Sequence, residues 1–324
     1  MVANSTNMAT PDYVAAHPSD GKRNVETTVL YFSGDPKAKL EPTIIGGPNP
    51  PNLTPKIPSP VSITDVTGDE DKYFLEAQGF QFVKHKTKFE EALPELKSRY
   101  KASEELDEIT VGYYEEMKEL LAQTLASNKK YPKPSSIHIL THIIRAGPKD
   151  GEGDRGPAGP LYGVHVDQST WAAEGVAERW LGHDQAAELL KKPRFQIINV
   201  SKPSSRMWRP CKPITRDPFA VSDATSIPDE HIITVPLIFP DHTAEALEVC
   251  PAQDPQKPHR YYYKFNQHPD DVLFFIQVDS SKQPDVPRRC PHVAFKDPNL
   301  DESKGEPRIS IETRAMVFYD VDEA

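Results

Sequence analysis

The sequence predicts a mostly β fold with flanking helices, built around a double-stranded β-helix core of the jelly-roll, cupin-like type. The chain of 324 residues contains 33 prolines, which break helix interiors and favour loops and strand edges. A single block in the first half has helical periodicity, and the chain after it is dominated by short β-branched and aromatic runs separated by turns. Short strands at such spacing, following a helical block, are typical of a barrel or jelly roll supported by helices.

The first sixty residues predict little regular structure. Residues 1–25 are polar and without pattern, which predicts a flexible N-terminal arm, and we expect residues 26–324 to form a single domain. The run TVLYF at 28–32 predicts a strand. The segment 35–62 is so rich in proline that it predicts an extended loop without regular structure.

A helical part and the start of the β core follow. Apolar residues every three to four positions predict helices at 88–98 and 102–128, a helical buttress of about 88–128. The run SIHILTHIIR predicts a strand at 136–145. The Gly-, Pro- and Asp-rich stretch 147–160 is too polar to pack and is a candidate mobile lid.

The remaining elements complete a jelly-roll core that extends over about 136–320. Residues 161–168 predict the end of a strand, and 170–192 predict a helix that stops at Pro193. Further strands are predicted at 195–200, 232–239, 260–265, 271–278, 292–295 and 308–319.

Composition restricts the classes of function. With 38 basic and 48 acidic residues the net charge is −10, and the absence of a basic cluster argues against nucleic acid as a partner. No apolar run approaches the roughly 18–20 residues that span a bilayer, and the N-terminus lacks the pattern of a secretory signal. Cys211, Cys250 and Cys290 are widely spaced, so we expect free thiols, a cytoplasmic protein and no membrane association.

The first candidate for chemistry is the tripeptide His165-Val166-Asp167. In a strand, residues i and i+2 point to the same face, so one imidazole and one carboxylate can bind the same ion. A third ligand from elsewhere would complete the two-histidine, one-carboxylate set that holds non-haem Fe(II). With 11 His and 48 acidic residues such a pair also arises by chance. A second one, His268-Pro269-Asp270, lies in a sequence that favours a turn.

The third ligand and an anion-binding group come late in the chain. His292 opens a predicted strand, although a histidine in such a place is more often structural. Arg308 and Ser310 open the last strand on one face, where an arginine fork binds a carboxylate and the serine hydroxyl donates to it. Arg314 shares this face and is the alternative anion anchor. The order His-x-Asp, His, Arg-x-Ser fits a jelly roll whose mouth holds Fe(II) and the distal carboxylate of 2-oxoglutarate.

The sequence resembles a fungal and bacterial family of hydroxylases and desaturases. This family includes the gibberellin desaturase, the aspergillic acid cluster hydroxylase and proteins related to the cephalosporin methoxylase system. The resemblance covers about residues 28–320. It rests on VLYFSGDP, GFQFVKH (79–85), HIIR (142–145), YGVHVDQS (162–169), FQIINV (195–200), RDPFAVSDATSIP (216–228), RYYYKFNQHPDDVLFFIQVDSS (260–281), CPHVAFKDP (290–298) and PRISIETRAMVF (307–318).

The resemblance implies an oxygenase domain that uses Fe(II), 2-oxoglutarate and O2, with ascorbate as a helpful additive in vitro. It implies that His165, Asp167 and His292 bind the metal and that Arg308, with help from Ser310, binds 2-oxoglutarate. Two departures are visible: Trp208-Arg209-Pro210 follows what looks like an insertion, and Gln277 stands where the family often has lysine. Both concern the substrate more than the reaction class.

The substrate is expected to be a small natural product or amino-acid-like metabolite of secondary metabolism, which is hydroxylated, desaturated or closed into a ring. Candidate pocket residues are Arg145, Trp171, Arg206, Trp208, Arg209 and Gln277. The arginines suit a substrate carboxylate, whereas core packing of Trp208 or solvation of Arg206 is the plainer interpretation. The sequence leaves the oligomeric state open, with a homodimer as one option.

Three alternatives remain at this stage. The same three ligands can bind zinc in a metallohydrolase, although Arg308 and Ser310 favour 2-oxoglutarate. A jelly roll that binds a small molecule without catalysis would not need an intact metal triad. A cysteine nucleophile is the third option, because Arg289 and His292 adjoin Cys290 and would lower its pKa.

Overall fold

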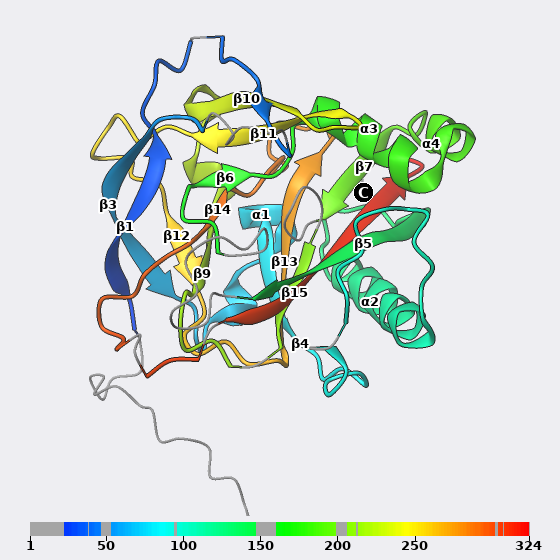
Figure 1. Ribbon diagram of the computed structural model, residues 1–324, viewed down its shortest axis with the longest axis horizontal. Helices are drawn as coiled ribbons and strands as arrows, with labels where there is room; N and C mark the ends of the chain where they lie inside the picture. Colours follow the sequence, from blue (N-terminus) through cyan, green and yellow to red (C-terminus); the bar gives the residue numbers. More distant parts are fainter. Residues whose placement is uncertain are drawn as a thin grey trace, which may run out of the picture.

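Two β-sheets dominate the protein, seen in the computed structural model in Figure 1. The structure describes residues 23–37, 39–46, 53–93, 96–146, 160–198, 206–211, 213–301, 304–306 and 308–323. The first sheet has nine strands in the order β1 (Val25–Phe32), β3 (Lys56–Asp65), β12 (Tyr261–Tyr263), β9 (Phe219–Ser222), β14 (His292–Ala294), β6 (His165–Val166), β11 (Thr243–Val249), β10 (Ile232–Ile238) and β2 (Thr43–Ile44).

The second sheet contains the longest strand pair of the protein. Its order is β4 (Phe80–Lys84), β13 (Asp271–Asp279), β7 (Arg194–Ile198), β15 (Ile309–Tyr319) and β5 (Ser136–Ala146), and β8 (Arg206–Pro210) pairs with β13 and β15. Side chains of this sheet contact those of the nine-stranded sheet: the ring of Phe275 on β13 lies 4.9 Å from that of His292 on β14. The predicted jelly roll, two sheets packed face to face, is confirmed.

Helices cover the six-stranded sheet (Figure 1). Helix α2 (Glu108–Ala126) buries Tyr113, Met117, Leu120 and Leu121 in the largest hydrophobic core, at the spacing that a single helix face requires. Helices α3 (Thr170–Leu181) and α4 (His183–Leu189) pack on a second cluster that includes residues of β5, β7, β13 and β15. Short helical turns are α1 (Leu75–Gln78), η1 (Glu70–Lys72), η3 (Ala224–Ser226) and η4 (Asp229–His231).

The predicted helical buttress is only partly correct. No α-helix forms over the described part of 88–98, where residues 88–92 make turns and Leu93 has 3-10 conformation, because Pro94 interrupts a run too short to be stable alone. Phe89 and Leu93 nevertheless reach the core. The second helix begins at Glu108 rather than 102, since the Asp107 side chain accepts a hydrogen bond from the Thr110 backbone and caps it there.

The prediction of a structureless 35–62 is wrong for its last part, which forms most of β3. This strand pairs with β1 over residues 56–63 but with β12 only at residues 63–65. Pro58 and Pro60, both exposed, therefore lie where β3 is an edge strand. Prolines two residues apart place their missing N–H groups on one edge, which an edge strand tolerates.

Other boundaries differ from the sequence prediction for local reasons. The helix predicted at 170–192 is split at Gly182, whose φ of 84° ends α3. The predicted arm includes one residue too many, because Val25 is buried and begins β1. Residues 1–22 and all of the lid candidate except its last residue, Pro160, lie outside the described residues. Strands β4, β8, β9 and β11 were not predicted, nor was β2, which lies inside the loop predicted at 35–62.

Candidate metal centre

Two histidines meet as cross-strand partners in the nine-stranded sheet. His165 on β6 lies opposite His292 on β14 in an antiparallel pair. Partners of this kind direct their side chains to the same face, and the two imidazole centroids are 4.3 Å apart. The two residues are 127 positions apart in sequence, and only the strand register brings them together.

Asp167 completes the group because it follows His165 by two residues and lies on the same side. Its Oδ1 is 3.4 Å from His165 Nε2, and its Oδ2 is 4.0 Å from His292 Nε2. Candidate ligand atoms of the three residues all lie within 4.8 Å of one another. Two imidazole nitrogens and one carboxylate around a single point form the donor set that suits non-haem Fe(II), with positions left open for other ligands.

Backbone carbonyl groups fix the orientation of both imidazoles. His165 Nδ1 is 2.8 Å from the Gly163 carbonyl oxygen, and His292 Nδ1 is 3.1 Å from that of Cys290. A proton on each Nδ1 satisfies these contacts and leaves Nε2 with a free lone pair. Nε2 of His165 is buried and has no hydrogen-bond partner among the described residues. A metal ion fits the centre, since it would accept the lone pair of this buried Nε2 and so give the atom a partner.

The surroundings of the centre are largely apolar and dry. The side chains of His292 and Asp167 are 0 % and 4 % exposed, and that of His165 is 15 % exposed. Rings of Phe219 and Phe275 lie 5.4 Å and 4.9 Å from the His292 ring. Aromatic walls of this kind limit solvent at a metal site and strengthen its electrostatic interactions.

Gln277 contacts the centre from the opposite sheet. Its Oε1 accepts a hydrogen bond of 2.8 Å from the Asp167 backbone N–H, and its Nε2 lies 3.4 Å from His292 Nδ1. Gln277 is 1 % exposed. The structure therefore places this predicted substrate residue behind two of the candidate ligands.

Arg308 lies near the centre at the start of β15. Its Nη1 donates a hydrogen bond of 2.8 Å to the Asp217 carbonyl oxygen, and its Cζ lies 6.0 Å from the centroid of Phe219, the ring that also contacts His292. Burial lowers the pKa of Arg308 to about 10, so the guanidinium is still charged at neutral pH. The ring of Phe219 lies between the Arg308 guanidinium and His292, so an anion could bind the guanidinium at one end and the metal at the other.

Ser310 supports the same interpretation. It follows Arg308 by two residues and is 0 % exposed, and its Oγ is buried without a hydrogen-bond partner among the described residues. A buried hydroxyl without a partner is costly. A bound carboxylate would accept its hydrogen bond.

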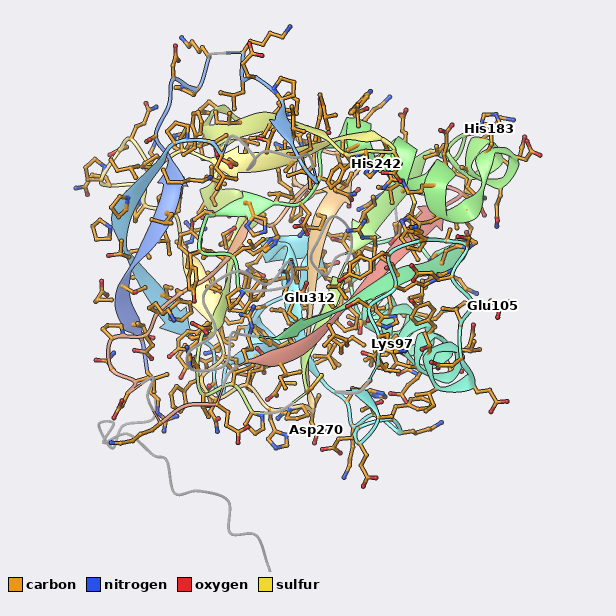
Figure 2. The ribbon with its side chains drawn as sticks, in the orientation of Figure 1. Lys97, Glu105, His183, His242, Asp270 and Glu312 are labelled. Carbon is orange, nitrogen blue, oxygen red and sulfur yellow. The ribbon has the colours of Figure 1, made fainter. Side chains whose placement is uncertain are left out.

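The two other predicted arginines of this region are deeply buried. Arg145 Nε donates to Glu312 Oε2 at 2.5 Å, across the β5–β15 ladder; Figure 2 labels Glu312 in the first half of β15. This ion pair occupies at least part of the Arg145 guanidinium, which the sequence analysis expected to bind substrate. Arg314 is 1 % exposed on the same strand.

The remaining substrate candidates are less well placed by the structure. Trp171, on α3, is 58 % exposed, so its contact with a substrate stays a prediction. Arg206, Trp208 and Arg209 lie on β8, which pairs with β13 and β15, but their side chains lie outside the described part of the chain.

The cysteine alternative is not supported. Burial raises the pKa of Cys290, whose Sγ contacts the Ser222 carbonyl oxygen at 3.2 Å. Arg289, expected to lower that pKa, instead pairs with Asp229. The second His-x-acid motif lies in a turn as expected, since the His268 backbone N–H donates to Asp271 Oδ2 at 2.9 Å.

Some residues that shape the site were missed by sequence analysis. Asp217 presents its carbonyl to Arg308 while its carboxylate accepts a hydrogen bond of 2.7 Å from Tyr162. Phe219 separates Arg308 from His292. The only signal in the sequence was that both belong to the stretch RDPFAVSDATSIP, which has few helix formers and contains a left-handed residue, Asp217, with φ 53°.

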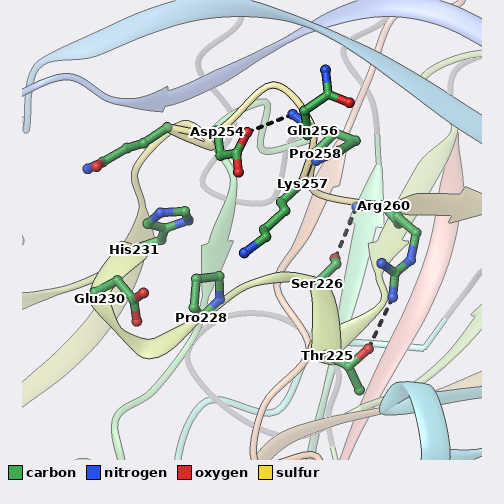
Figure 3. A pocket seen from close by; sticks show the side chains of 11 residues that line it. Thr225, Ser226, Pro228, Glu230, His231, Asp254, Gln256, Lys257, Pro258 and Arg260 are labelled. Atoms are coloured by element: carbon green, nitrogen blue, oxygen red, sulfur yellow. Dashed lines mark hydrogen bonds between the residues drawn. The ribbon is translucent and has the colours of Figure 1, made fainter.

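A separate cavity of about 570 Å³ lies near η3 and η4 (Figure 3). Its wall includes charged groups of both signs, Lys257 and Arg260 against Glu230 and Asp254, and none of the three candidate metal ligands. His231 lines it and begins a buried chain: His231 Nδ1 to His259 Nε2 at 2.9 Å, His259 Nδ1 to Tyr31 at 3.0 Å, and Tyr31 to Tyr261 at 2.7 Å. We assign no chemistry to this cavity.

Comparison with known proteins defines the class. A family model described as "Oxidoreductase/YMDC permease-like domain" matches residues 29–318, and the chain belongs to this family. Among the described residues, no helix has both the length and the apolar character needed to cross a membrane.

Particular relatives make the class more specific. The chain is 32% identical over 281 residues to the hydroxylase/desaturase efuI of Hormonema carpetanum, which covers 82% of this chain and 85% of that protein. It is 31% identical over 282 residues to the hydroxylase/desaturase CTB9 of Cercospora beticola, covering 82% and 78%. It is 25% identical over 263 residues to the alpha-ketoglutarate-dependent dioxygenase tstK of Talaromyces stipitatus, covering 80% and 84%.

A solved structure has a similar fold. The iron and alpha-ketoglutarate-dependent endoperoxidase NvfI matches with a TM-score of 0.70 at 22% identity, over 91% of this chain and 98% of that one. The predicted family and fold class are thus confirmed.

Proposed function

We propose that the protein is an Fe(II)- and 2-oxoglutarate-dependent oxygenase that oxidises a small metabolite. The observation that carries the proposal is the meeting of His165, Asp167 and His292 on one face of a jelly roll. The predicted reaction class agrees with the names of the relatives, which are hydroxylase/desaturases and alpha-ketoglutarate-dependent dioxygenases.

Two groups of residues would bind the metal and the co-substrate. His165 and His292 would hold Fe(II) through Nε2 and Asp167 through its carboxylate, while each histidine Nδ1–H donates to a backbone carbonyl oxygen. Arg308 and Ser310 would hold the distal carboxylate of 2-oxoglutarate, with Arg314 as the alternative anchor. When bound, the iron and its co-substrate supply the O2-dependent oxidation. The protein orients the substrate and keeps water out.

The finer assignments are part of the same proposal. The substrate is a natural product or amino-acid-like compound that is hydroxylated, desaturated or cyclised. The chain acts in the cytoplasm as one oxygenase domain, and a homodimer is one arrangement open to it. Because Arg145 pairs with Glu312, the β8 residues Arg206 and Arg209 are the better candidates for binding a substrate carboxylate.

The test uses purified protein without oxygen. Adding 2-oxoglutarate to the Fe(II)-loaded protein should produce a weak visible charge-transfer band, and His165→Ala should abolish it. Admitting O2 with the substrate, and with ascorbate to keep the iron reduced, should release succinate. A band that survives His165→Ala would contradict the ligand assignment.

The same experiment separates the zinc and binding-only alternatives. A zinc hydrolase would give no charge-transfer band and no oxygen consumption, because Zn²⁺ has no redox chemistry. A jelly roll that only binds a small molecule would not form succinate under any condition.

A further inference from the structure

Gln277 occupies an irregular position on β13. The pairing of β13 with β7 runs through Ile276 and Val278, and the register shifts between them. Gln277 is thus the extra residue of a β-bulge. Bulges beside active sites turn one side chain out of the regular alternation, and this one directs an amide towards β6 and β14 of the other sheet.

The side-chain amide of Gln277 accepts a hydrogen bond from the backbone N–H of Asp167, the residue that follows β6. Strand β6 ends at Val166, so the Asp167 N–H lies beyond the ladder that β6 forms with β11 and β14. Gln277 Oε1 accepts this N–H at 2.8 Å. Asp167 is only 6 % exposed, so removal of Gln277 Oε1 would take a hydrogen bond from a buried backbone N–H and loosen the position of Asp167.

The other end of the amide lies against the second ligand. Because Oε1 must face the Asp167 N–H, Nε2 packs against the His292 ring, 3.4 Å from its Nδ1, whose proton is donated to the Cys290 carbonyl. The neighbouring residue of the bulge, Ile276, accepts the Cys290 N–H at 2.7 Å. The Cys290 carbonyl in turn accepts from His292 Nδ1. One bulge on β13 therefore supports Asp167 and His292 together.

We propose that Gln277 is a positioning residue that holds Asp167 and His292 at the separation a metal ion needs. The inference rests on the proposed function of His165, Asp167 and His292 as metal ligands. It differs from the expectation that Gln277 contacts substrate. Loss of a group that orients metal ligands typically lowers metal affinity by about 10- to 100-fold.

The experiment measures Co(II) binding to metal-free protein through the visible absorption of the ion. Gln277→Met keeps the length and volume of the side chain but removes the acceptor of the Asp167 N–H, and we expect the Co(II) affinity to fall by about 10- to 100-fold. Gln277→Glu keeps the acceptor oxygen and should retain most of the affinity. Gln277→Asn keeps the amide but is too short to reach Asp167, so it carries the test if Gln277→Met does not fold.

Gln196→Met is the matched control. Gln196 is also fully buried, on neighbouring β7, but its Nε2 donates to Asp279 at 2.7 Å, away from the candidate ligands. We expect this variant to lose stability and keep its Co(II) affinity. Thermal unfolding of each metal-free variant, repeated with saturating Co(II), separates the two effects, because a purely structural role leaves the metal-induced increment unchanged.

Three outcomes decide the matter. Wild-type Co(II) affinity in both Gln277→Met and Gln277→Asn would overturn the positioning role while leaving the metal site intact. An equal loss in Gln196→Met would overturn it as well, since general destabilisation would then explain the effect. If His165→Ala binds Co(II) as tightly as the wild type, the proposed metal site itself is wrong.

Discussion

At the scale of single residues, Arg308 gives the sharpest test of co-substrate binding. Charge-assisted hydrogen bonds contribute about 1.5–3 kcal/mol, which corresponds to about 10- to 150-fold in affinity. We therefore expect Arg308→Gln to raise the KM for 2-oxoglutarate by about that factor, with a smaller effect on kcat. Succinate formation at varied 2-oxoglutarate gives both constants.

The control for this prediction is Arg288→Gln. Arg288 is half exposed and pairs with Asp229 outside the centre, so its replacement should leave the KM for 2-oxoglutarate unchanged. An unchanged KM in Arg308→Gln would reassign the anchor, and Arg314→Gln would then be the next variant to measure.

The sequence predicted part of the site at this scale, and the limit has a physical cause. His165 and Asp167 share a face because of the two-residue period of a strand, which sequence alone reveals. His292 joins them only through the register of β14 against β6, a long-range pairing that no local pattern encodes. Gln277 was expected to contact substrate because the family often has lysine there, and its contacts with Asp167 and His292 depend on a bulge that strand alternation does not reveal.

At the scale of elements, the N-cap of α2 explains where the helix begins. The Asp107 side chain accepts the Thr110 N–H at 2.7 Å, and this backbone hydrogen bond lowers the pKa of Asp107, so the charged cap is present at neutral pH. Asp107→Ala should lower the free energy of unfolding by about 1 kcal/mol, measured by urea denaturation at pH 7. Glu105→Ala, at an exposed position just before the helix (Figure 2), should change it little; equal losses would contradict the capping role.

The buried chain between β1 and β12 predicts a pH dependence. If Tyr261 donates to Tyr31, Tyr31 to His259 and His259 to His231, each of these three donors has an acceptor. If the three hydrogen bonds run the other way, the hydroxyl proton of Tyr261 has no acceptor among the described residues. His259 is therefore held neutral. Its burial, and then the neighbouring His231, lower its pKa to about 4.

The sign of the effect follows from proton binding in the two states. In the unfolded chain a histidine has a pKa of about 6.5, so between pH 6.5 and 4 the unfolded state binds a proton that the folded state does not. The contribution of neutral His259 to the free energy of unfolding is therefore lost as pH falls from 6.5 to 4, at about 1 kcal/mol per pH unit. Urea unfolding at pH 7, 6 and 5 should show a shallower loss for His259→Gln than for wild type. His183→Gln, changed at an exposed site (Figure 2), should match wild type, and equal slopes in all three proteins would contradict the argument.

The elements that the sequence predicted well are those with strong local signals. Strand β5 and the strands near 232–239, 271–278 and 308–319 were found within a residue or two. Errors arose where a tertiary neighbour overrode the local pattern: β3 exists despite its prolines because β1 lies beside it. The split after α3 was missed because Gly182 was counted as a helix residue.

At the scale of the whole molecule, the proposed ligands lie on both sheets. His165, Asp167 and His292 belong to or adjoin strands of the nine-stranded sheet, whereas Arg308 and Ser310 lie at the start of β15 in the other. A 2-oxoglutarate that binds the metal and Arg308 would therefore connect the two sheets. Ligands that bind only the folded state stabilise it by an amount that grows with their concentration.

The last prediction uses this linkage in thermal unfolding. Co(II) at about 100 times its Kd should stabilise the protein by about 2.7 kcal/mol, and 2-oxoglutarate added to the Co(II) protein should raise the Tm again. Arg308→Gln should keep the first increment and lose the second, while His165→Ala should lose both, because the keto acid needs the metal to bind. If the chain is one domain, as proposed, each increment should shift a single cooperative transition. A metal that moved only part of the transition would show instead that the two sheets unfold separately.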